Sequence, residues 1–151
     1  MIRQGILADA TEIARIINQA FEIEREFRAG DRTSPDEVRR LMERDSFLVA
    51  EEEARPVGAV HVRIDGQTGY FGMLAVDASA RRSGIGRALV EAAEARCRKA
   101  GCTIMTLSTG EDRVELIPYY QRQGYRVTAV EPSTNPAFKR PIRVVTMAKP
   151  L

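Results

Sequence analysis

The sequence is organised around one stretch, Met73-Leu74-Ala75-Val76-Asp77-Ala78-Ser79-Ala80-Arg81-Arg82-Ser83-Gly84-Ile85-Gly86-Arg87-Ala88-Leu89. Its first four residues are apolar and predict a buried strand. Gly84 and Gly86 allow the backbone to turn tightly and to approach a ligand closely. The free N–H groups at a helix start suit an anion, and three arginines add charge around the same turn: Arg81, Arg82 and Arg87. The stretch therefore predicts an anion-binding turn between a strand and a helix.

The helix after this turn is predicted to be amphipathic. Its apolar positions recur at helical spacing, interrupted by Arg96: Ile85, Ala88, Leu89, Ala92, Ala93, Cys97 and Ala100. The other face carries Arg87, Glu91, Glu94, Arg98 and Lys99, which are expected to be solvated. Gly101 stands where a left-handed C-terminal cap is expected. The pattern predicts a helix packed on a sheet, with its N-terminus directed at the anion.

Spacing excludes two nucleotide-binding motifs at this turn. Arg87-Ala88 follows Gly86, so the Lys-Ser/Thr ending of a P-loop is missing, and a dinucleotide fingerprint would need a third glycine. A turn that served only as a connection would bring arginines together with no gain. A pyrophosphate held without a metal is the ligand that remains.

Length and composition indicate one ordinary globular domain over residues 1–151. The hydrophobic content is 44% and the charged content 29%, which are usual values. A formal net charge of +2, with both signs interspersed, argues against nucleic acid or a membrane as partner. The two cysteines, Cys97 and Cys102, are too few for a disulfide framework. With no apolar leader or membrane-spanning run, we expect a cytoplasmic protein.

The remaining segments predict strands and helices in a mixed order. Strands are expected at 2–7, 47–50, 57–64, 70–76, 103–108, 125–130 and 143–147, and helices at 9–22, after Ser34-Pro35, at 85–100 and at 118–123. Two capping boxes, Asp9 to Glu12 and Ser34 to Glu37, mark helix starts, and Asp65-Gly66 predicts a hairpin. Gly72 suggests a bulge in its strand. The order implies an α/β (α+β) fold with a mixed, mostly antiparallel sheet of six to seven strands, a parallel crossover around the central helix, and about four helices on its two faces.

The central motif resembles a known family. Arg81-Arg82-Ser83-Gly84-Ile85-Gly86, preceded by Leu-Ala-Val-Asp, is similar to the acetyl-CoA-binding motif of the GNAT N-acetyltransferase superfamily. Residues 2–22 resemble that family's first strand and helix, and Tyr119-Tyr120-Gln121-Arg122-Gln123-Gly124-Tyr125 resembles its late tyrosine-containing segment. Two positions depart from the pattern: Arg82 stands where glycine is usual, and Arg113 where asparagine is frequent.

The resemblance implies a function and its residues. It implies transfer of an acetyl group from acetyl-CoA to a primary amine of a small molecule or peptide by direct attack, with Tyr120 as the general acid for the departing thiolate. The cofactor would be held by Leu74, Ala75, Val76, Arg81, Arg82, Ser83, Gly84, Ile85, Gly86 and Arg87. The backbone of Leu74 and Val76 would pair with the pantetheine arm. A homodimer is possible, and the alternative function is a non-catalytic acyl-CoA-binding or sensing domain.

The general base and the acceptor stay open at this point. The candidates for the base are Glu22, Glu24, Glu26, His61 and water, and each side chain has a structural or solvated role as its alternative. The same acidic segment would attract a cationic amine. The opposite interpretation is that Arg25, Arg28 and Arg32 neutralise those carboxylates in i, i+3 and i, i+4 pairs.

Overall fold

The computed structural model describes residues 1–81 and 84–151 and contains a seven-stranded sheet in the order β1-β2-β3-β4-β5-β7-β6. Its strands are β1 (Ile2–Gln4), β2 (Ser46–Glu52), β3 (Arg55–Asp65), β4 (Thr68–Val76), β5 (Ile104–Gly110), β6 (Arg126–Pro132) and β7 (Arg143–Pro150). Its α-helices are α1 (Ala10–Ala20), α2 (Pro35–Leu41), α3 (Ile85–Lys99) and α4 (Leu116–Gln121). Three 3₁₀ helices complete it: η1 (Leu7–Asp9), η2 (Glu22–Glu26) and η3 (Ala78–Ala80).

The helices cover both faces of the sheet, as predicted. Each face of the sheet has its own hydrophobic core, and alternate side chains of β2 enter one core or the other. Phe47 and Val49 pack with α1 and α2, whereas Leu48 and Ala50 pack with α3. A strand buried on both faces has a continuous apolar run. Helix α3 lies close to β3 because Gly58 has no side chain, and a Cβ there would be 3.0 Å from both Ile85 Cγ2 and Leu89 Cδ1. None of the helices formed by the described residues is long and apolar enough to span a membrane.

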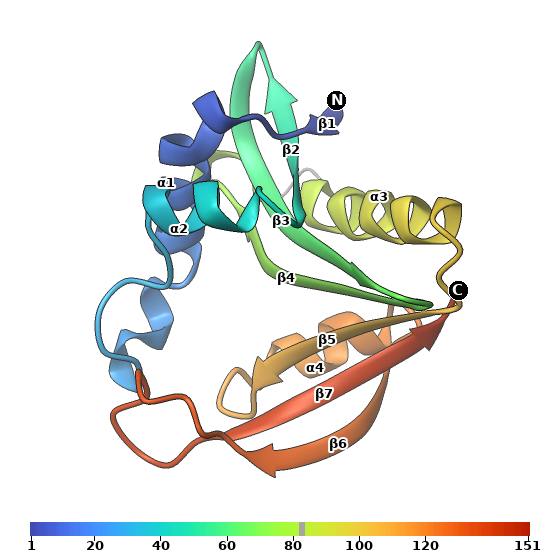
Figure 1. Cartoon of the computed structure of the whole chain (residues 1–151). Helices are drawn as coiled ribbons and strands as arrows, with labels where there is room; N and C mark the ends of the chain where they lie inside the picture. Colours follow the sequence, from blue (N-terminus) through green and yellow to red (C-terminus); the bar gives the residue numbers. More distant parts are fainter. Residues whose placement is uncertain (82–83) are drawn as a thin grey trace.

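A wedge opens in the middle of the sheet. Strands β4 and β5 are parallel, as the crossover rule predicts, but they pair only from Thr68–Ile104 to Tyr70–Thr106. Beyond these pairs the two strands diverge, which Figure 1 shows clearly. All other neighbouring strands are antiparallel. The last part of β4 therefore has a partner strand on one side and an open edge on the other.

A bulge in β4 lies where the wedge begins. His61 of β3 pairs with Gly72, whereas Ala59 pairs with Ala75, so β4 holds one extra residue between them. Met73 takes the left-handed conformation there, with φ of 49°, which is costly for a residue with a side chain. A bulge of this kind bends the strand and increases its twist. The bulge predicted at Gly72 is thus present, with the strained residue one position later.

Several predicted boundaries move by a few residues. The first strand ends at Gln4 instead of continuing to residue 7, and the helix predicted at 9–22 is α1, followed by the separate 3₁₀ helix η2. Asp9 does not cap α1 through its side chain, because its carboxylate binds Arg3 and accepts the Ile6 N–H at 2.8 Å. The second capping box is confirmed in its Ser34 half only, since Ser34 Oγ accepts the Glu37 N–H at 3.1 Å, whereas the Glu37 carboxylate accepts the Thr33 hydroxyl.

Helix α3 differs from its prediction at one position. Glu94 was expected on the solvated face, but only 3% of it is exposed. Its carboxylate accepts the Tyr125 hydroxyl at 2.7 Å and the Lys149 ammonium at 3.0 Å. Burial of a carboxylate is tolerable when it is paired and hydrogen-bonded in this way. Gly101 adopts φ of 92° and ends the helix, as predicted.

Candidate functional site

A large cleft lies at the start of α3. It has a volume of about 820 Å³ and is lined by the end of α1, the end of β4, the first turn of α3 and the segment before and within α4. Among the predicted cofactor residues, Leu74, Ala75, Val76, Arg81, Gly84, Gly86 and Arg87 line this cleft. Ile85 begins α3 and packs against the core, and Arg82 and Ser83 lie outside the described residues.

The first turn of α3 presents unused backbone donors to this cleft. Gly84 precedes the helix in the left-handed conformation, with φ of 75°, and no side chain of residues 1–81 or 84–151 caps the helix start. The first N–H groups of a helix have no partner within the helix. A Cβ at Gly86 would lie 2.8 Å from the Tyr119 hydroxyl, so a larger residue there would have to displace the end of that side chain. The turn thus offers bare amides and room for an anion beside them.

The open edge of β4 forms the neighbouring wall. The Asp77 N–H donates to Val57 O at 2.7 Å, so that residue directs its N–H towards β3. Because alternate residues of a strand direct their groups to opposite sides, Val76 directs its groups towards the wedge. The Val76 carbonyl accepts Arg81 Nε there at 3.2 Å. An extended ligand arm could use this edge as an added strand would.

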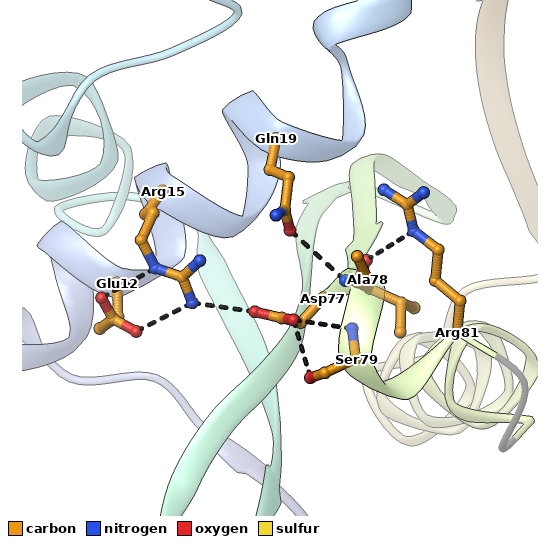
Figure 2. A network of polar contacts seen from close by, with 8 residues as sticks. Glu12, Arg15, Gln19, Asp77, Ala78, Ser79 and Arg81 are labelled. Atoms are coloured by element: carbon orange, nitrogen blue, oxygen red, sulfur yellow. Dashed lines mark hydrogen bonds and ion pairs between the residues drawn. The ribbon is translucent and has the colours of Figure 1, made fainter.

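A network of polar contacts joins α1 to the turn before α3 (Figure 2). Arg15 donates to Asp77 Oδ2 at 2.9 Å, and Gln19 accepts the Ala78 N–H at 3.4 Å. Asp77 also accepts the Ser79 N–H at 3.0 Å and the Ser79 hydroxyl at 2.8 Å. These hydrogen bonds, first that of the Ser79 N–H and then that of Arg15, lower the pKa of Asp77 to about 2. The carboxylate fixes the entry to the anion-binding turn.

The charges of the turn are more dispersed than predicted. Arg81 is exposed and donates to the Val76 carbonyl. The side chain of Arg87 is 72% exposed and pairs with Glu91 at 3.1 Å on the surface of α3. Both line the cleft, so they can add long-range attraction for an anion. Among the described residues, Arg81 contacts Val76 and Arg87 contacts Glu91, so neither guanidinium is held at the first amides of α3.

Two adjacent tyrosines of α4 have different surroundings. Tyr119 lines the large cleft, whereas Tyr120 is 6% exposed and packs edge-on against Phe71 and Tyr125. The pKa of Tyr120 is raised, mainly by burial and next by Tyr119, so the phenol stays protonated at neutral pH. Within the described part of the chain, its hydroxyl makes no hydrogen bond. Tyr120 therefore keeps its proton on a ring that is fixed by packing, and it is not among the residues that line the large cleft.

A second, smaller cavity opens between the diverging strands. It has a volume of about 190 Å³ and shares Phe21 and Leu116 with the large cleft. Its walls come from the segment after α1, from β4 and β5, and from the loop between β6 and β7. That loop is joined to the segment after α1, since Ala29 N–H donates to Ala137 O at 2.7 Å and Lys139 N–H to Phe27 O at 2.8 Å. Phe21 and Leu116 thus form a boundary that the two neighbouring cavities share.

The acidic segment is neutralised by arginines. Glu22 pairs with Arg25 at 3.0 Å, and Glu26 with Arg140 at 3.0 Å. Glu24 is buried and pairs with two arginines, Arg28 at 3.2 Å and Arg113 at 2.9 Å. The interpretation in which arginines neutralise these carboxylates is therefore confirmed for Arg25 and Arg28. Arg113 stands where the resembling family frequently has asparagine, and it forms one of the two ion pairs of Glu24.

His61 lines neither cavity. It is 5% exposed, its Nε2 is 2.8 Å from Asp45 Oδ2, and its ring stacks on Phe47. Burial lowers the pKa of the imidazole, although Asp45 opposes the change. These contacts describe a structural histidine. Of the carboxylates considered as bases, Glu22 lines the large cleft and Glu24 the small cavity.

Several residues of the small cavity carried no signal in the sequence. They are Tyr70, Ser108, Thr109, Ser133, Asn135 and Phe138. They come from three distant segments, and only the divergence of β4 from β5 brings them together. No three His, Cys, Asp or Glu side chains in the described ranges are grouped so as to hold a metal ion.

Comparisons with curated proteins find partial matches. The chain is 32% identical over 94 residues to the uncharacterized protein YdhI of Bacillus subtilis (strain 168), covering 62% of this chain and 58% of that protein. It is 36% identical over 81 residues to an IAA acetyltransferase of Azospirillum brasilense, covering 52% of this chain and 53% of that protein. The matched regions thus span little more than half the length of these relatives.

Solved structures share the whole fold at low sequence identity. A ribosomal-protein-alanine N-acetyltransferase from Brucella melitensis has a TM-score of 0.81 at 21% identity, covering 100% of this chain and 99% of that one. The protein yncA from Salmonella typhimurium, solved with its cofactor acetyl-CoA, has a TM-score of 0.79 at 22% identity, covering 100% and 93%. Residues 11–125 match the family described as Acetyltransferase (GNAT) family. Because this match includes the cleft, the anion-binding turn and both tyrosines, the chain belongs to the GNAT acetyltransferase family.

Proposed function

We propose that this protein transfers an acetyl group from acetyl-CoA to a primary amine of a small molecule or peptide. The observation that carries the proposal is the large cleft, in which the uncapped start of α3 and the open edge of β4 face the same space. The amides suit a pyrophosphate, and the strand edge suits an amide-containing arm. Both groups occur in CoA, and membership in the family supports the same ligand.

The junction of the two cavities is suited to the reaction itself. The arm along β4 would bring the thioester to Phe21 and Leu116, which line both cavities. The amine would enter from the small cavity and attack the thioester carbonyl, so that a C–N bond forms and the C–S bond breaks. The electron pair leaves with the CoA sulfur, and the amine loses one proton to water or to a carboxylate of the cleft.

Tyr120 is proposed as the acid that protonates the leaving sulfur. Its raised pKa keeps the proton on the phenol until a thiolate forms. Thiols are stronger acids than phenols, so this proton transfer is useful only when the phenol is held close to the sulfur. Contacts of the ring with Phe71 and Tyr125 supply that rigidity.

Cofactor binding is tested first with calorimetry on CoA. Gly86→Asp places a negative charge beside the free amides and a side chain against the Tyr119 hydroxyl, so CoA affinity should fall by at least about tenfold. Gly86→Ala is the matched control for steric crowding alone and should lose less. Unchanged CoA affinity in a folded Gly86→Asp protein would remove the pyrophosphate from this turn.

The role in catalysis is tested with the adjacent tyrosines. Tyr120→Phe should bind CoA normally and lower turnover by about 10² to 10⁴, the usual range for positioned proton transfer. Tyr119→Phe is the matched control, since it removes a hydroxyl from the next residue. Equal turnover in both variants would reject Tyr120 as the acid. Binding of CoA without turnover on any amine would favour the alternative of an acyl-CoA-binding domain.

A further inference from the structure

The small cavity contains an arginine without a carboxylate partner. Arg32 is partly buried and lines the cavity together with Arg28 and Glu24. Its guanidinium carbon lies 5.4 Å from the centre of the Phe21 ring, and among residues 1–81 and 84–151 it makes no ion pair or hydrogen bond. A guanidinium removed from water normally has an anion to bind. Arg32 lines the cavity, so an anion there could supply that partner.

The carboxylates around Arg32 are already engaged. Both oxygens of Glu24 accept hydrogen bonds, one from Arg28 and one from Arg113. Glu37 accepts the Thr33 hydroxyl. Burial lowers the pKa of Arg32, and repulsion by Arg28 lowers it further. An anion in the cavity would offset both effects and complete the pairing of the arginines.

The charge of the cavity is positive on balance. Its described charged residues are one carboxylate, Glu24, and two guanidinium groups, Arg28 and Arg32. Hydroxyl groups of Ser108 and Thr109 stand on the β5 side. Such a set recognises a carboxylate through paired N–H donors and hydroxyls. A cationic amine without an acid group would meet repulsion there.

The size and position of the small cavity limit which molecules can bring a carboxylate to Arg32. A volume of 190 Å³ equals that of about six water molecules, so it suits a small molecule. Arg32 contacts Phe21, which also lines the large cleft. An anion on Arg32 would therefore leave the amine of the same molecule near the junction of the cavities, with only a few bonds between the two groups.

We infer that the acceptor is a small amine that carries a carboxylate close to its amino group, as a free amino acid does, and that Arg32 with Arg28 binds that carboxylate. This inference rests on the proposed acetyl transfer. It differs from the attraction of cationic amines that the acidic segment had suggested. It also separates free amino acids from peptide N-termini, whose first carboxyl group is an amide.

The test compares free amino acids with their C-terminal amides as acceptors, by release of the CoA thiol at saturating acetyl-CoA. Acids should exceed amides by about 10- to 100-fold in kcat/KM, the range for hydrogen bonds to charged groups. Arg32→Gln should abolish this preference with little loss on amides, and Arg32→Lys should keep part of it. Arg25→Gln is the matched control, because Arg25 lines neither cavity and pairs with Glu22 and Asp31, and it should keep the full preference.

The outcomes separate the inference from the proposed function. Amides or peptide N-termini that react as well as acids would overturn the inference and leave acetyl transfer intact. If no amine releases thiol, the proposed acetyl transfer is wrong, and the inference about Arg32 is then tested by a binding measurement. N-acetyl amino acids titrated into the CoA-bound protein should bind wild type at least tenfold more tightly than Arg32→Gln, whereas equal affinities, or no binding to either, would overturn the inference without any turnover.

Discussion

Asp77 offers a quantitative test of how the anion-binding turn is held. Asp77→Asn removes the charge that accepts hydrogen bonds from Ser79 and Arg15 while keeping the shape of the side chain. The folded pKa of about 2, against the ordinary 3.8, corresponds to about 2.5 kcal/mol at neutral pH. Salt screening of the exposed Arg15 reduces this value. We therefore expect a loss of about 1–2 kcal/mol in the free energy of unfolding.

The pH dependence of this loss has a definite sign. Because the folded pKa lies below the unfolded one, the stabilisation is complete above about pH 5 and disappears as the pH falls towards 2. The pH-dependent part of the difference between wild type and Asp77→Asn should shrink to about half by pH 3. Urea unfolding followed by circular dichroism at pH 7, 4 and 3 measures it.

A matched variant controls for the loss of one acidic residue. Asp65 lies at the exposed end of the β3–β4 hairpin, and its side chain makes no hydrogen bond or ion pair with the described residues, so Asp65→Asn should change stability by less than about 0.5 kcal/mol. CoA affinity should fall in Asp77→Asn but not in Asp65→Asn. A difference between wild type and Asp77→Asn that stays constant from pH 7 to 3 would refute the reasoning, because the charge would then contribute nothing.

Burial and close packing lead to three other expected outcomes. Gly69→Ala should cost about 1–3 kcal/mol, because a Cβ there would lie 2.6 Å from Cys97 Sγ; adding Cys97→Ala should restore part of the loss in urea melts, and no restoration would contradict the contact. Burial raises the pKa of the Cys97 thiol to about 11, so an aromatic disulfide reagent at pH 8 should modify it only as the protein unfolds, and immediate labelling would show that the thiol is accessible. Tyr125→Phe should lower the free energy of unfolding by about 1–2 kcal/mol, since it removes a hydrogen bond of 2.7 Å to buried Glu94; a smaller effect than that of Tyr119→Phe would argue against that bond.

Local patterns were sufficient to predict the strand, turn and helix around residues 73–89. The roles of the two glycines, the apolar helix face and the C-terminal Gly101 depend only on neighbours within a few residues. A local sequence pattern is therefore enough to predict them. The same holds for the Ser34 cap and the Asp65-Gly66 hairpin. The late tyrosine segment was predicted by family resemblance, and its helix α4 is present.

Features that depend on distant partners could not be predicted. Glu94 was assigned to the solvated face because its partners, Tyr125 and Lys149, come from segments 31 and 55 residues later. Arg113 reaches Glu24 across 89 residues. Within the described part of the chain Arg32 has no ion pair, because the neighbouring carboxylates of Glu24 and Glu37 bind other residues. No local pattern predicts this. The composition of the small cavity was hidden for the same reason.

The three residue pairs that join β4 to β5 also mark where the sheet divides into two halves. One half of the sheet contains β1 to β4, and the other contains β5, β6 and β7, each with its own antiparallel ladders. Side chains rather than a backbone ladder hold the two halves together, because Phe71 of β4 packs edge-on against Tyr120 and Tyr125 within one buried core. A molecule bound across the wedge would therefore add a further link between two halves that already share a core.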